Sequence, residues 1–87
     1  MSVRLRLVAE LQAHMTRVIM KKLLEAGLVG THLWSKDHVL EVVMHNRDDY
    51  DSAMELMRME CPTEASSLFG MPDHESGYLL VFQFDNI

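Results

Sequence analysis

The chain has little of what marks the commonest membrane, disulfide-rich and phosphate-binding proteins. Its 87 residues include one cysteine, Cys61, so no internal disulfide can form. Only four glycines are present and none belongs to a Gly-rich loop, which excludes the usual phosphate-cradling motifs. No apolar run approaches the roughly 18–20 residues that cross a bilayer, and no apolar stretch leads to a small-residue cleavage site. These absences predict a cytoplasmic protein that does not bind membranes.

Residue patterns for catalysis or metal binding are also missing. The five histidines include no pair at i, i+4 spacing, and there is no second cysteine to complete a metal site. Asp48, Asp49 and Asp51 cluster where a helix is expected to start, and helix capping explains them without a second, poised carboxylate. No Ser-His-Asp spacing stands out. We therefore expect no catalytic residues, no metal and no cofactor.

Composition and charge point to one globular domain, residues 1–87. Apolar residues make up 48% of the chain and charged residues 24%, which are ordinary globular values. The net charge of −5 is unevenly divided, since residues 1–40 hold six Lys/Arg and three Asp/Glu, and residues 41–87 hold two and ten. A basic footprint for phosphates is absent, so no direct contact with nucleic acid is expected.

The first 26 residues allow two interpretations. Apolar Val3, Leu5 and Leu7 alternate with arginines, which predicts a strand over residues 3–8 followed by a helix over residues 9–26. Leu7, Leu11 and Met15 equally fit i, i+4 spacing, so the helix can instead start at about Val3. In both interpretations Gly27 ends the helix.

A β-hairpin is expected next, with strands over residues 28–34 and 39–45 and a loop over residues 35–38. Placing Trp34 opposite Val39 sets the register, and side chains alternate across each strand. That register directs Thr31 and Leu33 to the core with Leu40, Val42 and Met44. The opposite, uncovered face then carries His32, Trp34, Glu41 and Val43.

The second half is expected to contain one helix, one long connection and one strand. Asn46 or Asp48 can cap the helix, and Pro62 ends it. The inner stripe of this helix comprises Tyr50, Ala53, Met54, Met57 and Cys61. Residues 62–77 are interpreted as a loop because prolines and glycines punctuate them. Residues 78–85 are apolar at nearly every position, which predicts a strand covered on both faces or paired across an interface.

Together these elements predict an α+β fold with the order βαββαβ. This order resembles the ferredoxin-like pattern, in which two helices cover one face of a four-stranded antiparallel sheet. The alternative is αββαβ, with the longer N-terminal helix and a three-stranded sheet.

Two surfaces are candidates for binding a protein partner. One is the uncovered sheet face, and the other is the acidic outer side of the second helix together with an apolar cluster in the following loop. The residues of this second surface are Asp48, Asp51, Glu55, Met59, Phe69 and Met71.

The first functional hypothesis is a non-catalytic inhibitor or adaptor that occupies a basic surface of a larger partner, which itself processes nucleic acid. In size and charge the chain resembles phage-encoded inhibitors of host defence, including anti-CRISPR and anti-restriction proteins. The alternative hypothesis is a homodimeric regulatory domain. The stretch over residues 36–56 resembles ACT and Lrp-type effector modules, and this resemblance implies a small ligand held between two copies. A third hypothesis is an enzyme that uses His32 and Glu41, placed opposite each other.

Overall fold

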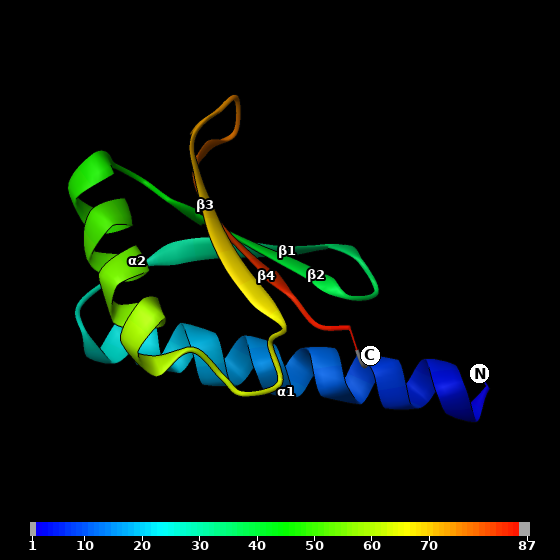
Figure 1. Cartoon of the computed structure of the whole chain (residues 1–87). Helices are drawn as coiled ribbons and strands as arrows, with labels where there is room; N and C mark the ends of the chain where they lie inside the picture. Colours follow the sequence, from blue (N-terminus) through cyan, green and yellow to red (C-terminus); the bar gives the residue numbers. More distant parts are fainter. Residues whose placement is uncertain (1, 86–87) are drawn as a thin grey trace.

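The computed structural model describes residues 2–85. Its elements are α1 (Val3–Glu25), β1 (Gly30–Lys36), β2 (Val39–Met44), α2 (Arg47–Glu60), β3 (Ser67–His74) and β4 (Gly77–Gln83). The strands form one antiparallel sheet in the order β1-β2-β4-β3, and both helices lie on the same side of it (Figure 1). The α+β class, with two helices on one face of a four-stranded antiparallel sheet, is thus confirmed and fits the ferredoxin-like description.

The order of the elements is αββαββ, so the strand predicted for residues 3–8 is wrong. These residues form the first turns of α1, as the alternative interpretation held. Ser2 caps the helix, because the backbone N–H of Leu5 donates to its Oγ at 3.1 Å. Over a run of only six residues, apolar side chains two positions apart can occur in a helix as well as in a strand. The hydrogen bond at Ser2 favours the helix here.

The fourth strand comes from the segment that was interpreted as a loop. Residues 67–74 form β3 at the edge of the sheet beside β4, so the three-stranded alternative is also wrong. Pro72 is tolerated because an edge strand need not donate every backbone hydrogen bond. Gly70 is required by packing, since a Cβ at this position would collide with the Tyr50 hydroxyl. Both residues therefore belong to a strand, although each is typical of a turn.

The helix ends follow the predicted signals. Gly27 has a φ of 76°, and the N–H groups of Leu28 and Gly27 donate to the carbonyls of Leu23 and Leu24, both at 2.9 Å. At the start of α2 the N–H of Asp49 donates to Oδ1 of Asn46 at 2.8 Å, so Asn46 is the capping residue. Both ends are thus held by specific backbone hydrogen bonds.

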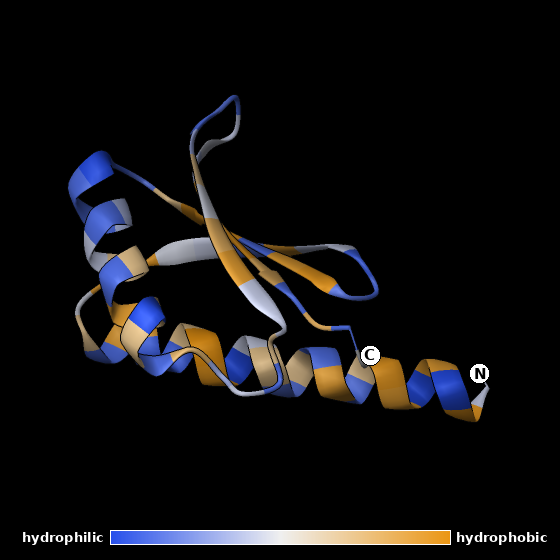
Figure 2. Ribbon diagram, viewed as in Figure 1, coloured by the Kyte–Doolittle hydropathy of each residue, from blue (hydrophilic) through white to orange (hydrophobic). Residues whose placement is uncertain are grey.

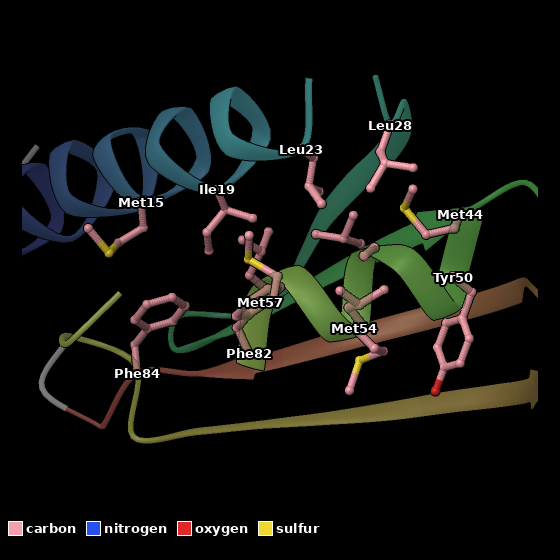
Figure 3. Close-up of a cluster of buried hydrophobic side chains, with 14 residues drawn as sticks. Met15, Ile19, Leu23, Leu28, Met44, Tyr50, Met54, Met57, Phe82 and Phe84 are labelled. Carbon is pink, nitrogen blue, oxygen red and sulfur yellow. The ribbon is translucent and has the colours of Figure 1, made fainter. Parts of the chain in front are cut away.

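The core lies between the two helices and the helix-facing side of the sheet (Figure 3). Met15, Ile19 and Leu23 of α1 meet the buried stripe of α2, as the helical spacing predicted. Several of the eight methionines are core residues, which suits their flexible side chains. Cys61 is half-buried at the end of α2, and burial raises the pKa of its thiol. Neither helix has the length and apolar content that a membrane span requires within residues 2–85.

A candidate protein-binding surface on the open sheet face

The register of the β1–β2 hairpin differs from the prediction by one residue. Trp34 pairs with Leu40 and His32 pairs with Val42. The strands extend to Lys36 and Val39, so the turn contains only two residues, and a bulge between Trp34 and Lys36 takes up the extra residue. Because a shift of one residue moves every side chain of a strand to the other face, the prediction for β1 is wrong: His32 and Trp34 lie on the helix-facing side.

Trp34 is part of the contact between α1 and the sheet. Its indole Nε1 donates a hydrogen bond to Oγ1 of Thr16 at 2.9 Å. Its ring centre lies 5.5 Å from that of Phe84, with the rings tilted by 43°. The side chain is only partly buried but is held on both sides. Trp34 therefore stabilises the fold and does not belong to the uncovered face.

On the side away from the helices the sheet carries rows of paired residues, one from each strand. Two neighbouring rows are mainly apolar, and the next row, Lys36, Val39, Gln83 and Ser67, is mainly polar. In antiparallel sheets directly paired residues share a face. We call the two mainly apolar rows the open face; they are Thr31, Val43, Leu79 and Met71, then Leu33, Glu41, Val81 and Phe69.

Six of the eight side chains on the open face are apolar. Leu33, Phe69 and Met71 are exposed at 61%, 44% and 38%. Leu79 and Val81 are buried although they are outside the core between the helices and the sheet, because their neighbours on β2 and β3 surround them. Figure 2 shows hydrophobic residues running along β3 and β4. Contiguous exposed apolar surface makes the open face a candidate interaction site.

Glu41 is the acidic group of the open face. It is half-buried and lies between Leu33 and Val81 in its row. The two ion pairs found within residues 2–85, Lys21–Glu25 and Arg47–Asp51, do not include it. Lys36, which pairs with Val39, lies on the same side of the sheet one row away. A carboxylate that forms no ion pair and lies among apolar side chains is a candidate contact for a basic group of a partner.

More acidic groups border the open face at the β3–β4 hairpin. A shallow depression there is lined by Met71, Pro72, Asp73, His74 and Glu75. Met71 belongs to the open face, so this depression extends it toward two carboxylates. The edge of the face thus adds negative charge beside apolar surface.

The acidic outer side of α2 is a separate surface. Asp48, Asp51, Glu55 and Met59 are exposed on this helix, which lies on the other side of the sheet from the open face (Figure 1). Arg47 Nε donates to Oδ1 of Asp51 at 3.0 Å, and this bond raises the pKa of Arg47. Part of the negative charge on α2 is therefore already compensated within the helix.

The structure regroups the residues predicted for binding. Phe69 and Met71, expected to act with the acidic helix, join Glu41 and Val43 on the open face. Leu33, Leu79 and Val81 complete this face but were missed. For Leu79 and Val81 a signal existed, since the continuous apolar run in β4 predicted coverage on both sides.

The hypothesis that His32 and Glu41 act together in catalysis required the two side chains to lie opposite each other, and the structure separates them. His32 pairs with Val42 whereas Glu41 pairs with Leu33, so the two side chains lie on opposite faces of the sheet. Over residues 2–85, no three His, Cys, Asp or Glu side chains come close enough together to hold a metal ion.

No family model, curated protein or solved structure matches this chain.

Proposed function

We propose that this protein is a non-catalytic protein-binding module that uses its open face to bind an amphipathic helix carrying basic residues. The observation that supports this role most directly is the pair of apolar rows left uncovered by the chain's own helices. A sheet packs one face on its core and must leave the other to water or to a partner. Side chains such as Phe69 and Met71 are typical anchors at interfaces.

The charge of the partner follows from the acidic groups in and around the face. Glu41 lies within it, and Asp73 and Glu75 lie at its edge. An arginine or lysine at the border of the docked helix would meet these carboxylates, while its aliphatic stem covers apolar surface. A basic partner is also what the excess of acidic residues after residue 40 predicts. The inhibitor role, with its resemblance to phage-encoded proteins, stays a prediction about which partner is bound.

A titration followed by NMR tests the surface directly. The ¹⁵N-labelled chain is titrated with a designed helical peptide of leucine and lysine at amphipathic spacing. We expect shift changes to concentrate at Leu33, Val43, Phe69 and Val81. Replacing Glu41 by glutamine should weaken binding by about two- to fivefold, as loss of one partly exposed charge contact does.

A matched charge change on α2 is the control. Glu55→Gln removes one carboxylate of the same kind from the acidic outer side of the helix and should leave the affinity unchanged. Shift changes that cluster around Asp51 and Glu55 would instead assign binding to the acidic helix. A peptide that perturbs neither surface at millimolar concentration would refute the binding role of the open face.

A further inference from the structure

The N-terminal end of α1 extends beyond the rest of the molecule (Figure 1). Along this helix the first fully buried side chain is Met15, and Gln12 still touches the body, since its Nε2 donates to the carbonyl of Asp37 at 3.0 Å. We call residues 3–11 the overhang; at 1.5 Å per residue it is about 13 Å long. Leu11, at the inner end of the overhang, packs against the core, whereas Val3, Leu5 and Leu7 remain exposed.

Apolar side chains dominate the overhang. Val3, Leu5 and Leu7 are all more than half exposed, and Figure 2 shows hydrophobic bands on this part of the helix. Leu7 and Leu11 continue the side of α1 that carries Met15 and Val18, because residues three, four or seven apart share a helix face. The side of α1 that covers the sheet thus remains apolar beyond the point where the sheet ends.

The charges of the overhang complement those of the open face. Arg4 and Arg6 lie in its first turns and Glu10 near its end, so two arginines against one glutamate leave the overhang with a net charge of +1. The positive end of the helix dipole adds to the two arginines, so this end of the helix favours nearby carboxylates. Glu41, Asp73 and Glu75 supply such carboxylates in and beside the open face. The overhang therefore has the character of the helix expected to bind there.

We propose that the open face of one copy is covered by the overhang of a second copy, and that the arrangement is reciprocal about a two-fold axis. This inference rests on the proposed function and names the bound helix. The overhang projects on the helix side of its own sheet, and the open face looks the other way. A two-fold rotation at the end of the sheet turns the second copy over, so that each overhang reaches the open face of the other copy.

The dimensions of the two surfaces agree. Three spacings of about 4.8 Å make the four-stranded face about 14 Å wide, close to the 13 Å or so of the overhang. Because the two-fold axis doubles the contact, burying about 300 Å² on each of the four surfaces reaches the roughly 1,200 Å² of the smallest stable interfaces. Exposed Val3 and Leu7, four residues apart on the helix, and Leu33, Phe69 and Met71 on the face are the side chains that supply this area.

Two substitutions test the contact, one in the overhang and one on the open face. Sedimentation equilibrium of the full chain is measured for wild type, for Leu7→Asp in the overhang and for Phe69→Asp on the open face. We expect a wild-type dimer at micromolar concentration. Each variant should raise the dissociation constant by about 100-fold or more, because a loss of about tenfold per copy counts twice in a symmetric dimer.

Leu24→Asp is the matched control for the overhang. Leu24 lies near the other end of α1 and is as exposed as Leu7, at 65% against 58%. This variant should remain dimeric. Circular dichroism and the fluorescence of the single tryptophan show whether each variant is folded, and both substituted side chains are exposed enough to permit it.

Mixing the two monomeric variants distinguishes this arrangement from other dimers. Leu7→Asp retains an intact open face and Phe69→Asp retains an intact overhang, so a heterodimer has one complete contact whereas each homodimer has none. Native mass spectrometry of the mixture should show the heterodimer in excess of both homodimers. If both variants are monomeric and mixing restores nothing, the contact joins like surfaces, and the inference is overturned.

The remaining outcomes separate this inference from the proposed function. A wild-type chain that is monomeric at 100 micromolar or so overturns the second copy as the bound partner, since protein contacts of biological use are tighter than this. The leucine–lysine peptide is then titrated into Leu7→Asp, which cannot use its own overhang. Binding to the open face in that variant retains the proposed function, and absence of binding removes it as well. A dimer that survives both substitutions also overturns the inference.

Discussion

Replacing Thr16 by valine tests whether Trp34 lies under α1. The substitution keeps the size and β-branching of the side chain and removes the oxygen that accepts the hydrogen bond from Trp34 Nε1. Threonine and valine have similar helix propensities, so that contribution nearly cancels. A hydrogen bond of this kind contributes about 0.5–1.5 kcal/mol net, and the indole N–H is only partly buried, so we expect a loss near 1 kcal/mol.

Urea denaturation followed by tryptophan fluorescence is the appropriate assay, because the chain has one tryptophan and it is the donor in question. For a domain of this size a loss of 1 kcal/mol also lowers the melting temperature by about 4–8 °C. Thr31→Val, on the open face, is the matched control and should not destabilise the protein. Equal effects at Thr16 and Thr31 would refute the placement of Trp34 and, with it, the register that defines the open face.

Three further measurements test the fold around this surface. Gly70→Ala should lower the free energy of unfolding in urea by about 1–3 kcal/mol because the new Cβ collides with the Tyr50 hydroxyl. Adding Tyr50→Phe should recover part of the loss. An unchanged urea midpoint would contradict the close contact. Asn46→Ala should lower the free energy of unfolding by about 1 kcal/mol and Asn46→Asp by much less, since aspartate still accepts from the Asp49 N–H. Cys61, whose thiol pKa burial raises, should react with iodoacetamide more slowly in the folded than in the urea-unfolded chain at about pH 8. The Cys61 thiol of the unfolded chain loses its proton at a lower pH than the thiol of the folded chain. The free energy of unfolding should therefore fall as pH rises above the ordinary thiol pKa, and an increase over that range would contradict the raised pKa of Cys61.

The parts of the fold that depend on long periodic patterns were predictable from the sequence. The stripe of α2 and the end of α1 at Gly27 are set by interactions within a few residues, and both were confirmed. The apolar run of β4 predicted a strand with both faces covered. Local chemistry determines these features, so a single sequence contains what is needed to find them.

Where two local signals conflict, a further interaction, either a helix cap or a tertiary contact, decided the outcome. Residues 3–8 satisfy a period of two and a helical period at once, and the cap at Ser2 together with continuity into α1 selects the helix. In β3, Gly70 and Pro72 carry the composition of a loop, yet pairing with β4 and the Tyr50 hydroxyl place them in a strand. Neither the partner strand nor the tyrosine is adjacent in sequence, so the local pattern could not reveal them.

The composition of the candidate site depends on one residue of hairpin register. With Trp34 opposite Val39, the uncovered face would have carried a tryptophan and a histidine, which suggested an aromatic or catalytic surface. With Trp34 opposite Leu40, the same strand contributes Leu33, and the face becomes apolar around a single carboxylate. The bulge before Lys36 causes this exchange, and the alternation of β1 is too weak to exclude either register, since both of its faces mix polar and apolar residues. The surface that carries the proposed role changes accordingly, from a face around Trp34 to an apolar face suited to an apolar helix with basic flanks. This is why the register must be tested through Thr16 before any substitution on the open face is interpreted.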